Sequence, residues 1–391
     1  MRGGKLPVRS VEGLVVGAGM RNWIFVKLTA GDFVGWGEAT LEFSTRSVVG
    51  ALDDLTPLVI GHDAFAIGQT FQRLTRHHFW RLGVESMSAV SGIDMALHDV
   101  KAQALGVPVY ELLGGAVRDR IRLYDHLGGG RAADVYGRVD PARFADLASE
   151  SVAAGFDAVK VLAVPISGLL ASGSDLATAA ATLMAIREAG GRDVEIMVDL
   201  HGRTSAAAAV AYAEAMAPAR PWFIEEPVAP GDLDGLEYVA AHTSIPLATG
   251  ERMVGRRAFR DLFDRNVVSV AQPDVCHCGG LTEIRAIGDL AQAYGVALAP
   301  HNPLGPIATW HNLHVAAATP NWMIQEQMRS AVAWFDDVVT APLVAVDGSV
   351  ELPTGPGLGV AVDEARCAEH PYEQEPAMAA AFRPDGSVAD W

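Results

Sequence analysis

Apolar stretches of strand length alternate with helical stretches from about residue 120 onward. Segments between them, such as DLATAAATLMAIREAG and LTEIRAIGDLAQAYG, place apolar residues at three- and four-residue spacing, as amphipathic helices do. We predict eight strands, most of them about 25 residues apart, at residues 121–127, 158–163, 194–201, 222–228, 245–251, 267–274, 296–302 and 322–327. Eight strand–helix repeats predict an α/β fold with a parallel (β/α)8 barrel rather than an open sheet.

The beginning and the end of the chain follow other patterns. Residues 23–28 and 33–38 flank the polar TAGD and predict a β-hairpin. Helical spacing of apolar residues runs from about 65 to 114, where glycines and Pro108 end the predicted helices. The tail contains the turn-rich ELPTGPGLGV. We therefore expect an N-terminal α+β capping domain, a barrel domain and a C-terminal segment that packs back on the capping domain, at residues 1–117, 118–342 and 343–391.

The composition argues against nucleic acid and membranes as binding partners. The chain has a net charge of −17, from 30 Lys and Arg against 47 Asp and Glu. Such a charge repels nucleic acid and anionic membranes, because phosphate binding needs clustered basic residues. An odd number of cysteines, three, argues against a disulfide framework. The chain shows neither a signal-peptide pattern nor a run of roughly 18 apolar residues, so we expect a cytoplasmic protein that binds neither nucleic acid nor membrane.

Ionisable residues end the later predicted strands. In a β/α barrel the carboxyl ends of the strands and the loops after them form the active-site face. Scattered surface charge would not fall at these places so regularly. The sequence therefore predicts an active site at the barrel mouth, built from Asp199, Glu225, Glu251, Asp274, His301 and Glu326.

Three of these acids have the spacing of a metal site. Asp199, Glu225 and Glu251 are 26 residues apart, one strand–helix repeat each, and should lie side by side. Taken singly, each could be a helix cap or an ion-pair partner, but three adjacent carboxylates repel one another unless a cation lies between them. Oxygen ligands with open positions suit Mg²⁺, with Mn²⁺ as an alternative, whereas Zn²⁺ favours His and Cys. Glu226 should point to the other face of its strand.

Two histidines are candidates for proton transfer. His201 comes two residues after Asp199, so on a strand it would share that face. Asp274 and His301 end neighbouring strands, and an Asp–His pair fixes the imidazole tautomer and raises its basicity, which suits a proton abstractor. Other histidines are interpreted as ordinary core or surface residues, among them His77, His78 and His242. The Cys276-His277-Cys278 run is interpreted as a loop after the sixth strand.

Several strings together resemble a known family: VDLHGR, FIEEPV, ATGERM, QPDVCHCGGLTEI, APHNPLGPIA and IQEQ. They look like the mandelate racemase branch of the enolase superfamily, and within it most resemble the galactonate dehydratases. The resemblance extends over nearly the whole chain, including SGIDMALHDVKAQALGVPVYELLGG and GPGLGV. It implies an Mg²⁺-dependent hydro-lyase that removes the proton α to a carboxylate, passes through an enediolate and eliminates the β-hydroxyl to give a 2-keto-3-deoxy sugar acid.

The resemblance also assigns roles to residues. It makes Asp199, Glu225 and Glu251 the metal ligands and His301, oriented by Asp274, the base. His201 becomes the acid for the leaving hydroxyl, and Glu326 a hydrogen-bond partner of the substrate carboxylate. Arg21 and Trp23, just before the first strand of the hairpin, correspond to a capping-domain loop that closes over the substrate.

The chain departs from the family pattern on its second barrel strand. Racemases of this branch carry Lys-x-Lys there, whereas Lys160 is followed by Val161 and Leu162, so a second base is missing. Galactonate dehydratases have a polar residue at the Leu162 position, which leaves the identity of the substrate open. Predicted substrate contacts are Lys160 and, on the first strand, Asp125 or His126, which could instead make ordinary hydrogen bonds at a strand end.

Two other functions stay open at this point. A sugar-acid cycloisomerase or epimerase would use the same enediolate, and only product analysis separates it from a dehydratase. A catalytically decayed paralogue that binds acid sugars is the remote alternative, and the complete set of candidate residues argues against it. Relatives in this branch are commonly symmetric, so we expect a homo-oligomer that binds a small-molecule sugar acid.

Overall fold

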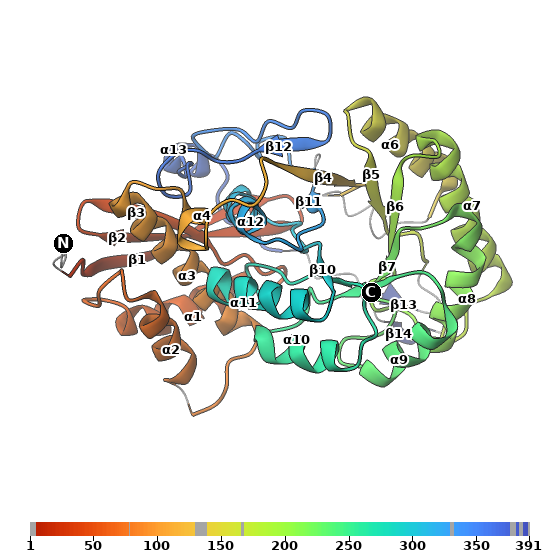
Figure 1. The fold of residues 1–391 in the computed structure, drawn as a ribbon, viewed down its shortest axis with the longest axis horizontal. Helices are drawn as coiled ribbons and strands as arrows, with labels where there is room; N and C mark the ends of the chain where they lie inside the picture. The colour runs from red at the N-terminus through yellow and green to blue at the C-terminus, as the bar shows by residue number, and fades with distance from the viewer. Residues whose placement is uncertain are drawn as a thin grey trace.

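The computed structural model describes residues 5–77, 79–129, 139–165, 168–328, 332–375, 381–382 and 386–389. Within these ranges, the N-terminal part holds an antiparallel three-stranded sheet, β1 (Val8–Ala18), β2 (Arg21–Ala30) and β3 (Phe33–Glu38) (Figure 1). The predicted hairpin corresponds to β2 and β3, and β1 extends it. The helices beside the sheet are α1 (Thr45–Leu55), the 3-10 turn η1 (Thr56–Leu58), α2 (Ile67–Arg76), α3 (Val84–Leu105) and α4 (Val109–Leu112).

Helix α3 packs against β3 at very short range. A Cβ on Gly37 would lie 2.0 Å from the carbonyl oxygen of Gly92, so glycine is required where strand and helix meet. The helix ends at Leu105, and Gly106 follows it with φ of +70° in the left-handed region, as glycines after helices commonly do. The glycines let α3 pack closely against the sheet, and the residue that begins the helix, Val84, lines the cavity described below.

In the described ranges, eight parallel strands form the barrel, which confirms the predicted fold class (Figure 1). The isolated parallel bridge between Leu298 and Trp322 joins the two ends of the sheet. Seven of the strands are shorter than predicted, because residues at one or both of their ends leave the ladder to form loops, and the first keeps its predicted length one position earlier. The strands are β4 (Arg120–His126), β5 (Ala158–Val161), β6 (Glu195–Asp199), β7 (Phe223–Glu225), β8 (Leu247–Thr249), β9 (Val270–Ala271), β10 (Ala297–Leu298) and β11 (Gln325–Gln327).

Helices follow the strands and cover the outside of the barrel. They are α6 (Pro141–Ala153), α7 (Gly173–Gly190), α8 (Ala206–Met216), the 3-10 turn η2 (Ala217–Ala219), α9 (Leu233–His242), α10 (Gly255–Asp264), α11 (Gly280–Ala293) and α12 (Pro306–Ala318). A large apolar core fills the layer between these helices and the strands. In the part of the chain that the structure describes, none of the helices combines the length and the apolar character needed to cross a membrane.

The barrel interior is layered. One apolar layer takes a buried residue from each strand or its immediate extension: Tyr124, Ala158, Met197, Phe223, Ala248, Val270, Ala299 and Ile324. Since alternate residues of a strand share a face, the next inward position lies two residues further along. At six strands that position carries an ionisable residue: His126, Lys160, Asp199, Glu225, His301 and Glu326. The strand period thus places a charged layer directly above an apolar one.

The C-terminal segment contacts both other parts of the molecule. Strand β12 (Ser349–Glu351) pairs antiparallel with β4, and the chain then runs back over the N-terminal sheet through α13 (Glu364–Cys367). There the amide of Gly17 donates to the carbonyl of His370 at 2.9 Å, within an apolar cluster that the two parts share. A short hairpin, β13 (Ala381–Phe382) with β14 (Val388–Ala389), lies near the end of the chain. The domain boundaries themselves stay a prediction.

Candidate active site

Three buried carboxylates meet at the carboxyl ends of neighbouring strands. Asp199 and Glu225 end β6 and β7 and are direct partners in the ladder, while Glu251 follows the end of β8 by two residues. Each offers an oxygen, and these oxygens all lie within 4.8 Å of one another. The exposed fractions are only 4%, 0% and 7%. The parallel register therefore brings together the three acids that the 26-residue spacing singled out.

The electrostatics of this cluster fit a divalent cation. Burial, reinforced by the neighbouring carboxylates, raises the pKa of Glu225 to about 7 and the pKa of Glu251 well above its usual value; burial likewise raises the pKa of Asp199. One oxygen of Glu225 and one of Glu251 are buried and accept no hydrogen bond from the described residues. Leaving buried acceptors unsatisfied costs about 1–3 kcal/mol each, and a bound cation would satisfy them.

Lys160 lies beside the cluster and compensates part of its charge. Its Nζ is 3.0 Å from Oε1 of Glu225 and 2.8 Å from Oε1 of Glu326. Burial alone would lower the pKa of Lys160, but these carboxylates hold it well above its ordinary value. Burial would raise the pKa of Glu326, and Lys160 with His301 instead lowers it to about 2. The second oxygen of Glu326 accepts from the amide of Asn302 at 2.6 Å, so both of its oxygens are engaged.

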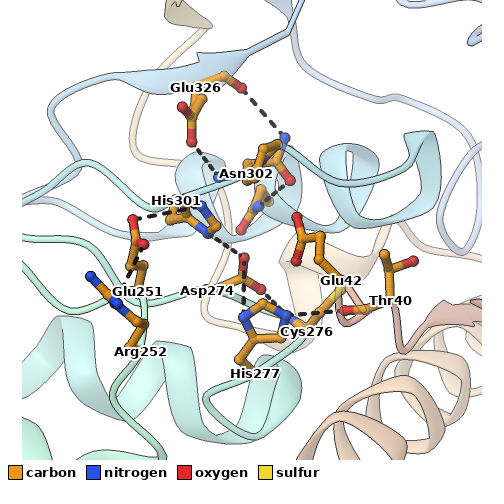
Figure 2. A network of polar contacts seen from close by, with 12 residues as sticks. Thr40, Glu42, Glu251, Arg252, Asp274, Cys276, His277, His301, Asn302 and Glu326 are labelled. Atoms are coloured by element: carbon orange, nitrogen blue, oxygen red, sulfur yellow. Dashed lines mark hydrogen bonds and ion pairs between the residues drawn. The ribbon is translucent and has the colours of Figure 1, made fainter. Parts of the chain in front are cut away.

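His301 and Asp274 form the predicted dyad (Figure 2). Nδ1 of His301 lies 2.8 Å from Oδ2 of Asp274, whose other oxygen accepts from the amide of Cys276 at 2.7 Å. With Nδ1–H donating to Asp274, Nε2 is the nitrogen at which His301 gains or loses a proton, and it lies 3.6 Å from Oε2 of Glu251. Burial would lower the pKa of His301, but Glu251 and Asp274 raise it to about 10. The geometry is that of a base with a fixed tautomer beside the carboxylate cluster.

His277 is a site residue that the sequence interpretation missed. Its Nε2 is 3.0 Å from the carbonyl of Thr40 in the N-terminal part, and its Nδ1 is 3.6 Å from Oδ2 of Asp274 (Figure 2). The ring therefore connects the capping part to the dyad. Its position three residues after Asp274 was the available signal. The flanking Cys276 and Cys278 are buried thiols whose pKa burial raises well above the usual range, so they stay protonated.

His201 reaches the site by a route other than the predicted one. Strand β6 ends at Asp199, so the expectation that His201 shares its strand face is wrong. The chain turns instead: His201 has φ of +56°, and its amide donates to Oδ1 of Asp199 at 2.7 Å. Such a conformation in a non-glycine residue costs about 1–3 kcal/mol and persists where surrounding contacts impose it. Burial, with Arg203 and Arg252, lowers the pKa of His201 to about 3.

A cavity of about 430 Å³ lies between the barrel mouth and the N-terminal part. His201, Glu251, Arg252, His277 and His301 line it on the barrel side. The N-terminal part contributes a wall of Leu41, Glu42, Phe43 and Val84. His301 of the dyad, one of the cluster carboxylates and His201 therefore face a single volume of small-molecule size.

Arg21 and Trp23 lie on β2 and not on the loop that we expected. Arg21 donates to Oε1 of Glu42 at 2.7 Å and also to the carbonyl of Pro303. Arg21 does not line the cavity itself, but it holds Glu42, which does. Burial would raise the pKa of Glu42, but Arg21 keeps it below its ordinary value. Trp23 is 1% exposed and packs edge-on against Phe335, with ring centroids 5.6 Å apart. It belongs to the apolar core.

The two predicted substrate contacts on β4, Asp125 and His126, lie on opposite faces of the strand. Tyr124 is in the apolar layer inside the barrel, so His126, two residues on, shares the inner face and Asp125 faces the helices. Both ring nitrogens of His126 are buried without a hydrogen-bond partner among the described residues. Burial and Lys160 lower the pKa of His126 to about 3, which keeps the ring neutral. Leu162 is buried, with 4% exposure.

Comparisons with known proteins agree with this geometry. Two family models match the chain: the mandelate racemase/muconate lactonizing enzyme N-terminal domain over residues 13–114, and the enolase C-terminal domain-like family over residues 143–366. This chain belongs to the mandelate racemase/muconate lactonizing enzyme family of the enolase superfamily.

Relatives in this family match nearly the whole chain. A D-galactonate dehydratase from Ralstonia pickettii is 40% identical over 380 residues, which is 94% of this chain and 96% of that protein. One from Xanthomonas oryzae pv. oryzae is 38% identical over the same shares. Among solved structures, an enolase superfamily member from Salmonella Typhimurium has a TM-score of 0.88 at 29% identity, covering 94% of this chain and 98% of that one. A mandelate racemase/muconate lactonizing enzyme-like protein from Roseovarius sp. TM1035 also has a TM-score of 0.88, at 28% identity, covering 94% and 96%.

As a member of this family the chain is an enzyme, and the relatives place it among the hydro-lyases. The structure brings together most of the residues that the sequence singled out, around one carboxylate cluster that suits a divalent metal. Trp23 and Asp125 point elsewhere, into an apolar core and toward the outer helices. The catalytic and binding role of each residue stays a prediction.

Proposed function

We propose that this enzyme is an Mg²⁺-dependent sugar-acid dehydratase that acts on D-galactonate or a near epimer. The observation that carries the proposal is the shared cavity: His301, held by Asp274, and His201 face the same volume as Glu251 of the carboxylate cluster. Elimination of water from a sugar acid needs a base for the α-proton and an acid for the leaving hydroxyl at one carboxylate-binding centre. Both histidines are available here.

Asp199, Glu225 and Glu251 would hold the metal. Three carboxylate oxygens with room for further ligands suit Mg²⁺, and Mn²⁺ would be accepted by the same donors. The chemistry that such an ion supplies when bound is positive charge next to the substrate carboxylate, where the dianion develops as the α-proton leaves. Enzymes lower barriers by about 8–23 kcal/mol in total, and electrostatic stabilisation of this kind is commonly the largest part.

The chain's own groups carry the proton transfers. The His301 pKa of about 10 belongs to the metal-free site, where the Glu251 carboxylate raises it. With that carboxylate neutralised by a cation, Nε2 of His301 takes the α-proton, and Asp274 stabilises the imidazolium through the hydrogen bond at Nδ1. His201 gives a proton to the departing β-hydroxyl, which leaves as water, and the resulting enol becomes the 2-keto-3-deoxy acid. The low pKa of His201 belongs to the ligand-free site; an anionic substrate beside the ring opposes that shift, because it stabilises the imidazolium.

Other groups of the site suit a hydroxyl-rich substrate. Glu42, ionised through Arg21, is an acceptor for hydroxyl groups on the capping side. His126 is a neutral ring with buried nitrogens on the barrel side, and we propose that it contacts a distal hydroxyl. Glu326 and Lys160 are the proposed partners of the substrate carboxylate. Because its low pKa makes Glu326 an acceptor only, its hydrogen bond to the substrate carboxylate requires a proton on one of the two carboxyl groups, whereas Lys160 can donate directly.

The test is a panel of six-carbon and five-carbon sugar acids incubated with the enzyme and Mg²⁺, assayed for 2-keto-3-deoxy products. We expect turnover of D-galactonate or a near epimer and a loss of at least about 10²-fold in His301→Asn. His242→Asn, which changes an exposed histidine stacked on Tyr238, is the matched control and should keep full activity.

Other results would separate the alternatives. Deuterium uptake at the α-carbon without a keto product would support epimerisation or cycloisomerisation through the same enediolate. Neither product nor exchange across the panel, with Mg²⁺ bound, would contradict the proposed reaction.

A further inference from the structure

Arg252 connects three strand ends of the barrel. Its Nε donates to Oε2 of Glu226 at 2.7 Å, and its Nη2 donates to the same oxygen and to the carbonyl of His201, the latter at 2.8 Å. The other oxygen of Glu226 accepts from the hydroxyl of Thr249 at 2.8 Å. Glu226 is 3% exposed, so this charge is paired inside the protein. One guanidinium–carboxylate pair therefore holds the loops after β6, β7 and β8 together.

The network surrounds a stretch of backbone in an unfavourable conformation. His201 has φ of +56° and Glu226 has φ of +45°, both in the region that favours glycine. Gly202, with φ of +68°, donates its amide to the carbonyl of Glu226 at 2.9 Å, and a Cβ there would come within 2.5 Å of Nη2 of Arg252. Strained residues of this kind persist only where the surrounding structure determines them. Here the bond from Arg252 to the His201 carbonyl is one of the determining contacts.

His301 is positioned by a separate set of contacts. Its ring is fixed by Asp274, and Asp274 is fixed in turn by the amide of Cys276. Both histidines face one cavity, but the groups that orient them come from different loops. A change in the Arg252–Glu226 pair should therefore displace one histidine more than the other.

We infer that Glu226 and Arg252 are positioning residues for His201, which govern elimination of the β-hydroxyl and not abstraction of the α-proton. This inference rests on the proposed role of His201 as the acid. The physical reason is that proton transfer requires the donor within hydrogen-bond reach of the leaving oxygen, and a misplacement of about 1 Å can cost about 10²-fold in rate. The Arg252 bond is made to the His201 backbone, so its loss would shift the ring.

The experiment measures two rates on the same substrate, the sugar acid of the panel that the native enzyme dehydrates, beginning with D-galactonate. In D₂O with saturating Mg²⁺, formation of the keto product reports elimination, and deuterium at the α-carbon of recovered substrate reports return of the enediolate (exchange), so the sum of the two rates reports proton abstraction. We expect Glu226→Gln and Arg252→Lys to lower the elimination rate by about 10- to 100-fold. The sum of their elimination and exchange rates should stay within about threefold of native, since His301 keeps its contacts.

Two reference variants make the outcome decisive. Glu283→Gln alters a second Glu–Arg pair, in which half-exposed Arg256 lies 2.8 Å from buried Glu283. Neither residue lines the cavity, so both rates of this variant should match native. His201→Asn should lose elimination and keep exchange. Titration with Mg²⁺ by calorimetry checks the metal site, because Nε of Arg252 lies 3.9 Å from Oε1 of Glu251 (Figure 2); we expect native affinity in Glu226→Gln.

The possible failures are distinguishable. If His201→Asn keeps the native elimination rate, the proposed acid is wrong and the positioning role falls with it. If His201→Asn behaves as expected but the Glu226 and Arg252 variants lose both rates in parallel, or neither rate, the inference alone is overturned.

Discussion

Lys160 shows how a single buried charge can hold an active site together. It is 1% exposed and lies between Glu225 and Glu326, each within 3.0 Å of its ammonium group. Removing one partner of a buried ion pair leaves uncompensated charge in a low-dielectric interior, which is far more costly than losing a surface pair. The chain lacks the second lysine of the racemase Lys-x-Lys pattern, because Leu162 stands there. The first lysine, Lys160, is needed to compensate the charge of the two buried carboxylates.

The first prediction at this scale concerns stability. We expect Lys160→Met to lower the free energy of unfolding of the metal-free protein by about 3–5 kcal/mol, measured by urea denaturation. The control is Lys27→Met, which removes a partly exposed ion pair with Glu364 and should cost under about 1 kcal/mol. Equal losses in the two variants would contradict the role of Lys160 in charge compensation.

At the scale of elements, the N-terminal sheet caps a barrel helix. Glu38, the last residue of β3, accepts from the amides of Gly305 and Ala308 at 2.7 and 2.8 Å, at the start of α12, and from the hydroxyl of Thr40 at 2.6 Å. A carboxylate at a helix N-terminus satisfies amides that have no partner within the helix. A Cβ on Gly305 would lie 2.6 Å from this carboxylate, so glycine is needed there. The contact joins two parts of the chain that pattern analysis treats separately.

We therefore expect Glu38→Ala to lower the free energy of unfolding by about 1–3 kcal/mol for each donor left buried and unpaired. Burial raises the pKa of Glu38 to about 7 from its ordinary 4.5. The stabilisation from its protonated form is full below about pH 4.5 and is lost as the pH rises through about 7. The loss caused by Glu38→Ala should accordingly be larger at pH 5 than at pH 8, measured by urea denaturation at both pH values. A loss that grows with pH would contradict the raised pKa.

At the scale of the whole molecule, the cavity depends on all three parts of the chain. The barrel supplies the carboxylates and histidines, and the N-terminal part supplies the opposite wall. The C-terminal segment supports that wall: Glu375 accepts from the amide of Phe43 at 3.0 Å and from the hydroxyl of Thr45 at 2.8 Å. Phe43 itself has φ of +60°, so the wall is held in a conformation that needs such support.

A metal bound by three strands should stabilise the whole fold. Binding to the native state alone adds about 2.7 kcal/mol when the free metal is at 100 times its Kd. We expect Mg²⁺ to raise the Tm and a chelator to reverse the rise, measured by scanning calorimetry. Asp199→Asn should remove this response, whereas Asp193→Asn, a change of the same kind at an exposed acid, should keep it. If Mg²⁺ leaves the Tm of the native protein unchanged, that result would argue against the cation site.

Local sequence patterns were sufficient to predict most of the barrel. Strand length, helical spacing and the 26-residue interval are properties of short stretches and of their order, and they predicted all eight strands and the cluster of Asp199, Glu225 and Glu251. The pattern failed where it was irregular. Strand β1 was missed because charged residues interrupt the apolar ones in its sequence, VRSVEGLVVGA. Helix α1 was missed because only 11 residues show the helical spacing of apolar positions.

The sequence by itself therefore determined the architecture and the identity of the groups at the barrel mouth, because the two-residue period of a strand and the repeat of strand and helix place side chains without reference to distant residues. The tertiary structure decided how those groups are oriented. His277 meets Thr40 across 237 positions of sequence. Arg252 meets Glu226 across one strand–helix repeat and the turned backbone of His201 across two. Such contacts arise from the packing of segments that local patterns describe one at a time, so only the folded chain specifies them.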